Sequence, residues 1–319
     1  MNEISATVED GYDGLRLDRY VSDVLGVCSR SQLKQREVEV TINGKPAKLA
    51  RQVKSGDSLT VRYSSPEPSA VEAEPVALDI LYEDDEVIVI NKPAGMVVHP
   101  AQGNRHGTLM QGLLYYVAGL KSAYGEHTLA DRPGIVHRLD KETSGVIITA
   151  KNPAAHEFLA KQFRLRRTVK VYLAVVKGGP RSSVGSVEAT LARDPDNRKR
   201  FAVTSGKGKP SLTRYRVLAR NKDYALLHLS PQTGRTHQLR VHMKHIGCPI
   251  LGDPLYARQG GGYSNIGLML HAYRLTIEVP DGTVHTFTAP LPERFTGFLS
   301  MAFPGVLAGG SLDAVEDQP

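Results

Sequence analysis

Alternating apolar and polar positions run through much of the chain and predict more strands than helices. Every second residue from Val169 to Val175 is apolar, which predicts a strand over 168–176 with Tyr172 on its opposite face. The run Val146–Ile148 is apolar without interruption, which predicts a strand buried on both faces. The main secondary-structure signal is therefore that of a sheet.

Turn and capping residues place the ends of several elements. Asn43-Gly44 and Asp281-Gly282 predict tight hairpin turns, because both pairs tolerate a left-handed backbone. Thr108 and Asn152 are typical capping residues and predict helices that begin directly after them. Many strands with few, scattered helices predict an α+β fold, built on a mixed, largely antiparallel sheet flanked by helices and loops.

The composition predicts two domains. Residues 1–64 predict a small α/β domain, and residues 65–75 form an acidic, proline-rich linker without apolar periodicity. Residues 76–304 predict the main domain. Residues 305–319 are rich in glycine and acidic residues, which predicts a disordered tail.

The apolar content and the cysteines indicate the cellular compartment in which the protein is expected. No apolar run approaches the length of a membrane span, and the first residues do not resemble a signal peptide. Cys28 and Cys248 are far apart and show no metal-ligand spacing, so they are expected to be thiols in a reducing cytoplasm.

The charge is unevenly distributed. Residues 132–248 hold 24 Lys and Arg against 7 Asp and Glu, a net charge of +17, whereas the rest of the chain holds 16 against 26, or −10. Together these give the formal net charge of +7. A basic middle within an otherwise acidic chain favours a polyanionic partner, and nucleic acid in particular.

A cluster of charged residues precedes the apolar run at Val146. Asp140 lies between Arg138 and Lys141, in a loop followed by the small residues Thr143-Ser144-Gly145. A loop braced by a buried strand is a common place for reactive side chains. The residues alone leave open whether Asp140 is a reactive carboxylate or one partner of a solvated salt bridge.

Four motifs carry a resemblance to a known family. His137-Arg138-Leu139-Asp140, followed by Thr143-Ser144-Gly145, resembles the signature of the RluA-type pseudouridine synthases. Three further stretches match the family in the same order: Asn91-Lys92-Pro93-Ala94-Gly95, Lys170-Val171-Tyr172-Leu173-Ala174, and Thr233-Gly234-Arg235-Thr236-His237-Gln238-Leu239-Arg240-Val241-His242. The resemblance spans about residues 76–295. It is greatest to the family members that carry an S4 domain and act on large-subunit ribosomal RNA.

The resemblance implies a cofactor-independent isomerase that converts uridine to pseudouridine. It implies that Asp140 is the essential carboxylate, that Arg235 pairs with it and that Tyr172 stacks on the extruded uracil. Asp140 could attack C1′ or take a proton from C2′, and the sequence does not separate these routes. His237, His242 and His245 lack a carboxylate or cysteine at metal-ligand spacing, so no metal and no cofactor are expected.

The resemblance and the basic charge also imply RNA-binding residues. Arg138 matches the arginine that fills the gap left by the flipped base, and His137 is expected to shape the loop beside it. Residues 1–64 resemble an S4 RNA-binding domain, although a purely structural domain remains an alternative. The other expected RNA contacts are Arg30, Lys34, Lys45, Arg164, Arg166, Arg167, Lys170, Arg198, Lys199 and Arg200.

The expected partner is structured RNA. Large-subunit ribosomal RNA, or an assembling large ribosomal subunit, is the leading expectation, and a monomer that does not contact membrane is expected. The alternatives are a pseudouridine synthase that acts on tRNA and a non-catalytic RNA-binding factor in ribosome assembly. A histidine-based metallohydrolase is a third reading, which predicts bound metal.

Overall fold

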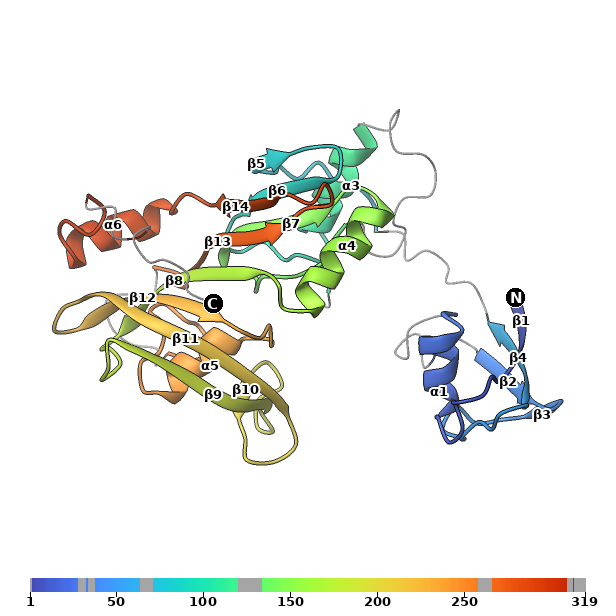
Figure 1. Ribbon diagram of the computed structural model, residues 1–319. Coiled ribbons are helices and arrows are strands. Elements are labelled where there is room, and N and C mark those ends of the chain that lie inside the picture. Colours follow the sequence, from blue (N-terminus) through green and yellow to red (C-terminus); the bar gives the residue numbers. More distant parts are fainter. Residues whose placement is uncertain are drawn as a thin grey trace. The chain divides into compact units, whose positions relative to one another are not determined.

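The computed structural model describes residues 2–27, 33, 38–63, 71–101, 103–119, 134–257, 266–308 and 312. The chain divides into two compact units, Met1–Ala70 and Val71–Pro319 (Figure 1). The division falls inside the stretch 65–75 that the composition suggests as a linker. Among the described residues, no helix combines the length and the apolar character needed to cross a membrane.

The described residues of the N-terminal unit include a small antiparallel sheet and a short helical segment at residues 17–24. Its strands have the spatial order β1-β4-β2-β3, and their bounds are β1 Asn2–Thr7, β2 Val38–Ile42, β3 Lys45–Pro46 and β4 Ser58–Tyr63. The helical segment consists of α1 (Leu17–Arg19), which runs into the π-helical turn η1 (Tyr20–Val24). The predicted turn at Asn43-Gly44 is confirmed, with φ of 52° and 73°. Strand β1 was not predicted: Ile4 and Ala6 alternate with polar residues, but this alternation is short and none of the strand's residues is fully buried.

The second unit is built on one ten-stranded sheet. Its order is β10-β9-β11-β12-β8-β13-β7-β6-β5, with β14 paired to β13. The strands are β5 Ile80–Glu83, β6 Val87–Lys92, β7 Ser144–Ala150, β8 Val169–Lys177, β9 Val184–Arg193, β10 Phe201–Val203, β11 Lys209–Arg220, β12 Tyr224–Pro231, β13 Leu270–Glu278 and β14 Val284–Thr288. Strands β7 and β13 pair in parallel, whereas the other named pairs are antiparallel. The predicted α+β fold with a mixed, largely antiparallel sheet is confirmed.

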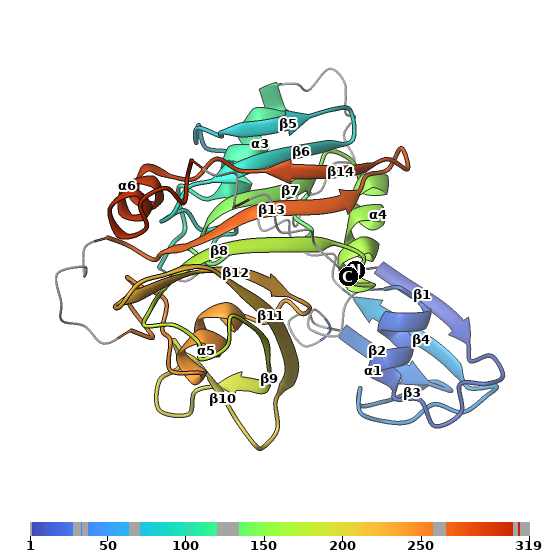
Figure 2. The same ribbon diagram turned by 60° about the vertical axis from the view of Figure 1, so that its left-hand side comes forward.

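In the described part of this unit the sheet is accompanied by the helices α3 Leu109–Gly119, α4 Pro153–Arg164, α5 Gln238–His245 and α6 Glu293–Ala302. Figures 1 and 2 show α3 and α4 beside the β5–β7 end, and α5 beside the β9–β12 end. The predicted start of α4 is confirmed, because Asn152 is extended (φ −142°) and its side chain accepts a hydrogen bond from the Ala155 amide at 2.9 Å.

A buried polar network holds α5 against β11. The Gln238 amide donates to the Leu212 carbonyl and to the Thr213 hydroxyl, both at 3.0 Å. His242 has no exposed surface and bonds through its two ring nitrogens to Ser211 (2.8 Å) and Thr213 (3.0 Å). Because the Ser211 hydroxyl donates to a backbone carbonyl, His242 Nε2 is the donor to Ser211. The Thr213 hydroxyl accepts from Gln238 and can donate to Nδ1, which suits a neutral ring.

The parallel pairing of β7 with β13 depends on one glycine. Gly145 has φ +115° and lies opposite Ala272, where an added Cβ would stand 2.1 Å from the Ala272 carbonyl oxygen. This pairing joins the β5–β7 end of the sheet to the remaining strands. Both the backbone conformation and the close approach therefore require glycine.

Gly145→Ala is expected to destabilise the second unit by about 3 kcal/mol or more, because it combines an unfavourable φ with a backbone clash. Gly282→Ala is the matched control, since Gly282 also has a positive φ (+86°) but no atom within 4 Å of the added Cβ. The control should cost about 1–2 kcal/mol. Urea unfolding followed by circular dichroism measures both, and equal losses would contradict the clash.

The buried side chain of His242 is expected to lower the stability of the protein in acid. Burial lowers the pKa of His242 to about 4, well below its ordinary value of 6.5. The unfolded chain then binds a proton more readily than the folded one, so this contribution is complete above pH 6.5 and is lost as the pH falls towards 4. At pH 5 the loss of stability, relative to neutral pH, amounts to roughly 2 kcal/mol.

The variant His242→Gln does not titrate at this position and keeps a donor and an acceptor for Ser211 and Thr213. Its unfolding free energy should fall by about 2 kcal/mol less than that of the wild type between pH 8 and pH 5. Chemical unfolding at both pH values tests this. Parallel curves for the two proteins would show that His242 does not carry the effect.

Candidate active site

Asp140 lies in the loop that leads into β7. The preceding residue, Leu139, is 4% exposed and packs in an apolar cluster with Ile88 and Ile147. The Asp140 carbonyl accepts a hydrogen bond from the Thr143 amide at 3.1 Å, which closes a tight turn. The backbone around the carboxylate is thus fixed on one side by the core and on the other by a turn.

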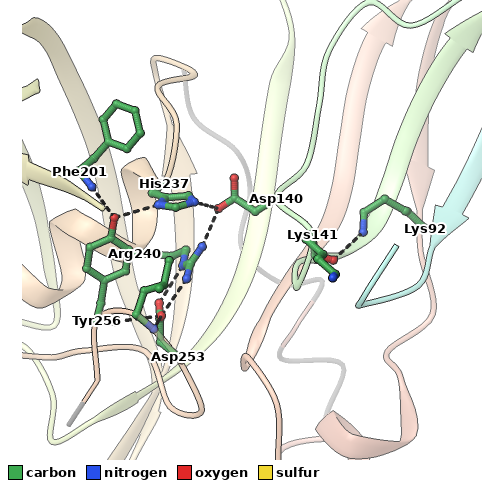
Figure 3. Close-up of polar contacts among 9 residues, drawn as sticks. Lys92, Asp140, Lys141, Phe201, His237, Arg240, Asp253 and Tyr256 are labelled. Carbon is green, nitrogen blue, oxygen red and sulfur yellow. Dashed lines mark hydrogen bonds and ion pairs between the residues drawn. The ribbon is translucent and has the colours of Figure 1, made fainter. Parts of the chain in front are cut away.

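Lys92 anchors the same loop from the end of β6. Its side chain has no exposed surface, and its amine donates to the carbonyls of Pro93 (2.7 Å), Met96 (2.9 Å) and Lys141 (3.2 Å). Burial lowers the pKa of Lys92 to about 8, although the charges of Glu142 and Asp140 oppose that shift. Figure 3 shows this contact beside the Asp140 carboxylate. A buried ammonium with three carbonyl partners ties β6 to the residue that follows Asp140.

The carboxylate of Asp140 meets Arg240 from α5. Arg240 Nη1 donates to Asp140 Oδ2 at 3.2 Å, and the Arg240 side chain is 4% exposed. The other edge of the same guanidinium donates two hydrogen bonds to Asp253, from Nε to Oδ2 and from Nη2 to Oδ1, both at 2.8 Å (Figure 3). Burial alone would lower the pKa of Arg240, but hydrogen bonds and charge from Asp253 and Asp140 raise it above its ordinary value. Arg240 therefore stays charged and bridges two carboxylates.

Tyr256 and His237 complete this arrangement. His237 Nε2 lies 3.9 Å from Asp140 Oδ2, and its Nδ1 is hydrogen-bonded to the Tyr256 hydroxyl at 2.8 Å. The Tyr256 hydroxyl also accepts the Phe201 amide at 2.8 Å, and its ring lies 5.1 Å from the Arg240 guanidinium. His237 adopts the left-handed conformation (φ 57°), a local cost that its contacts offset.

A cavity of about 600 Å³ opens beside Asp140. Its lining includes Tyr172 from β8 and Arg138 from the loop. Burial raises the pKa of the Tyr172 hydroxyl above its ordinary value, and the charge of Asp140 adds to the effect. The structure thus brings Tyr172, Arg138 and Asp140 to one cavity, as the resemblance implies.

The predicted pairing of Arg235 with Asp140 is wrong. Arg235 lines the same cavity, but its Nε donates to the Pro210 carbonyl at 3.2 Å, and its backbone amide bonds to Gln238 Oε1. It lies in the turn before α5, whereas Arg240 lies within the helix, on its buried side. The helical turn of α5 therefore presents the later arginine to the carboxylate.

His137 is a structural acceptor. Its Nε2 accepts the Ile148 amide at 3.1 Å, and its ring stacks on Phe163 at 4.4 Å. Burial, with a further contribution from the positive charge of Lys170, lowers the pKa of His137 to about 3. A neutral ring that accepts from β7 fits the expectation that His137 shapes the loop. Contact between His137 and RNA stays a prediction.

The other expected RNA contacts fall into three groups. Arg164, Arg166 and Lys170 line the cavity, and Arg167 adjoins it in sequence. Arg198, Lys199 and Arg200 lie in the connection between β9 and β10 and do not line the cavity. Lys45 is exposed on β3, and Arg30 and Lys34 lie outside the described residues. RNA contact by any of them remains a prediction.

Arg240 and Lys92 lie in the motifs that carry the resemblance but had no predicted role, and Asp253 lies outside those motifs. The signal for Arg240 is its position between Leu239 and Val241 on a short helix that the sheet covers, since a buried guanidinium needs a carboxylate. Its contact with Asp140 spans 100 positions and is not readable from spacing. Within the described ranges, no group of three or more His, Cys, Asp or Glu side chains could hold a metal ion.

Comparison with known proteins identifies the family. Residues 86–245 match the model of the RNA pseudouridylate synthase family. The chain is 45% identical over 294 residues to a ribosomal large subunit pseudouridine synthase D of Borreliella burgdorferi, covering 90% of each protein. It is 41% identical over 296 residues to an uncharacterized RNA pseudouridine synthase of Bacillus subtilis, covering 92% of this chain and 96% of the relative.

A solved structure agrees with this match. Human RNA pseudouridylate synthase domain containing 1 superposes with a TM-score of 0.58 at 27% identity, covering 79% of this chain and all of that one. The sequence match, the sheet and the motifs around Asp140 thus point in one direction. The chain belongs to the RNA pseudouridylate synthase family and is an RNA pseudouridine synthase, an isomerase.

Proposed function

We propose that the protein converts specific uridines to pseudouridine in large-subunit ribosomal RNA, with Asp140 as the essential carboxylate. The observation that carries the proposal is the Asp140–Arg240 contact at 3.2 Å beside a cavity that Tyr172 also lines. The reaction breaks the N1–C1′ bond, turns the uracil and joins C5 to C1′. The C5 proton leaves and N1 gains a proton, so no atoms are gained or lost overall.

Asp140 is the group suited to act on the sugar. Its side chain is 17% exposed, so one oxygen can face a ligand while Oδ2 contacts Arg240. An ionised carboxylate either attacks C1′ or takes the proton from C2′. Arg240 stabilises the ionised form in both routes and fixes its orientation.

Tyr172 and Arg138 are suited to hold the extruded nucleotide. The aromatic ring of Tyr172 offers a stacking face for uracil in a half-buried position beside Asp140. Burial keeps the Tyr172 hydroxyl protonated at neutral pH, so it can donate a hydrogen bond to the base. Arg138 is exposed at the rim, where it can occupy the space that the base leaves in the RNA stack.

Ribosomal RNA is proposed on the strength of relatives that carry that activity in their names. In addition to the Borreliella burgdorferi protein, a ribosomal large subunit pseudouridine synthase D of Neisseria meningitidis is 41% identical over 315 residues, which cover 94% of this chain. A cytoplasmic monomer that acts on free RNA or on an assembling large subunit completes the proposal. The N-terminal unit is proposed to act as an S4-like RNA-binding domain, through Lys45 and the positions Arg30 and Lys34.

Asp140→Asn is expected to lower the rate of pseudouridine formation by at least about a thousandfold, because the nearly isosteric amide is neither nucleophilic nor basic. The affinity for RNA should change little, since the cations that line the cavity remain. Cells that lack the protein, complemented with wild type or variant, provide the test through pseudouridine mapping of ribosomal and transfer RNA. Asp223→Asn, at an exposed position in the turn after β11, is the control.

Three outcomes of this mapping separate the parts of the proposal. Sites in large-subunit ribosomal RNA that return with wild type and Asp223→Asn but not with Asp140→Asn support it fully. If the sites that depend on Asp140 were found only in transfer RNA, the proposed substrate would be wrong and the proposed role of Asp140 would stand. If Asp140→Asn restored every pseudouridine site, Asp140 would not be the essential carboxylate.

Arg240→Lys and Arg235→Lys make the same chemical change five positions apart and test which arginine serves Asp140. A lysine at 240 cannot span Asp253 and Asp140 together, so kcat should fall by about tenfold to a hundredfold. Arg235→Lys should change kcat by less than about threefold, because Arg235 bonds to a backbone carbonyl. Single-turnover kinetics on one RNA, with melting temperatures as a folding check, measures both, and the reverse order would contradict the assignment.

A further inference from the structure

A second groove of about 810 Å³ adjoins the active-site cavity. It is formed over β8, β9, β11 and β12, and we call it the second groove. It shares Arg166, Lys170, Pro231 and Gln232 with the active-site cavity, so the two are continuous at the start of β8 and the end of β12. A ligand that leaves the active site at this point therefore meets the second groove directly.

Strand register places two arginines in the second groove. Arg214 on β11 lies opposite Ser230 of β12 on one side and Ser186 of β9 on the other, and Arg216 lies opposite His228. The alternate residues of β11, Ser211 and Thr213, bond to α5 through His242. Arg214 and Arg216 therefore project from the face of β11 that turns away from α5, and both are exposed.

The second groove is cationic and carries no described acid. Arg166, Arg167, Lys170, Arg214 and Arg216 all line it, whereas none of the described residues of its lining is Asp or Glu. In the described part of the chain, none of these five side chains forms an ion pair with a carboxylate. Five positive charges that converge without local neutralisation favour an anion with several charges.

Three hydroxyl groups add to this picture: one is buried, one is half-buried and one is exposed. Thr168, which lines the second groove just before β8, is 8% exposed, and its hydroxyl has no hydrogen-bond partner in the described structure. A buried polar group without a partner is rare in a folded protein and points to a missing water or ligand. Ser186 and Ser230 flank Arg214, so hydroxyl donors accompany the guanidinium groups.

We propose that the second groove binds the sugar–phosphate backbone of the substrate RNA strand next to the nucleotide held in the active site. Guanidinium groups suit phosphate oxygens, the groove is open to a strand that arrives from the cavity, and the acids that would repel phosphate are missing from its described lining. The inference rests on the proposed action on RNA. It adds Arg214 and Arg216 as phosphate contacts that neither a motif nor the cavity around Asp140 identifies.

The test compares the salt dependence of RNA binding. Wild type, Arg214→Gln/Arg216→Gln and a charge-matched control, Arg181→Gln/Lys222→Gln, are titrated with a transcript of large-subunit ribosomal RNA between 50 and 200 mM KCl. Arg181 and Lys222 are exposed and line neither the cavity nor the second groove. Each phosphate contact contributes about 0.7–0.9 to the slope of log K against log salt.

The groove variant should bind more weakly than wild type at 50 mM salt, with a slope smaller by about 1.4–1.8. Its further loss of affinity between 50 and 200 mM salt should thus be about tenfold smaller than that of the wild type. The control should keep the wild-type slope. Arg214→Lys/Arg216→Lys, which keeps both charges, should retain most of the slope and shows that the fold tolerates changes at these positions.

Two results would overturn the inference. One is a groove variant with the affinity and slope of the wild type, and the other is an equal effect of the control pair, which would indicate a response to net charge alone. Pseudouridine formation by the wild type on the same transcript is measured in parallel. If the wild type forms none, the proposed ribosomal substrate fails, whereas formation by the wild type with an unchanged slope in the groove variant refutes only the second groove.

Discussion

The site depends on one buried guanidinium that is shared by two carboxylates. Arg240 is 4% exposed, and a charge so far from water is stable only with close partners. Asp253, whose side chain has no exposed surface, supplies two hydrogen bonds and compensates most of that cost. Asp140 supplies a third at 3.2 Å and stays partly open to the cavity. Arg240 is therefore held by Asp253 whether or not Asp140 is engaged with a ligand, which lets Asp140 change partners during a reaction without leaving a free buried cation.

The two sides of this contact come from distant parts of the sheet. Asp140 is carried into place by β7, which pairs in parallel with β13 next to Gly145, and Arg240 arrives on α5 after β12. Strands β8 and β13 lie between β7 and β12 in the sheet, and the ring of Tyr172 comes from β8. The register around Gly145 thus sets the height of Asp140 relative to Tyr172 and Arg240. Only glycine fits the close approach to Ala272, so the glycine at position 145 also determines the geometry of the site.

The sequence predicted the elements that follow from local rules and missed those that depend on distant contacts. The Asn152 cap, the Asn43-Gly44 turn and the alternation around Tyr172 are properties of a few neighbouring residues, and the structure confirms them. The assignment of Arg235 failed because two arginines five positions apart are equivalent in composition. Only the placement of α5, with Gln238 and His242 bonded to β11, decides which one reaches Asp140. Strand β1 was missed for a different reason, since its apolar alternation consists of Ile4 and Ala6 alone and is too short to predict a strand.

The distribution of charge within the second unit separates binding from chemistry. Near the carboxylate the histidines are kept neutral: burial lowers the pKa of His137 to about 3, and burial also lowers the pKa of His237. The positive charge that contacts Asp140 directly therefore comes from Arg240 and does not vary with pH in the neutral range. In the second groove the arginines are exposed and none of the described lining residues is Asp or Glu, so their attraction for phosphate is weakened by salt. A polyanion can then bind through exposed cations whose attraction depends on salt. The carboxylate of Asp140 meanwhile keeps a buried partner, Arg240, whose charge and position do not depend on the solvent.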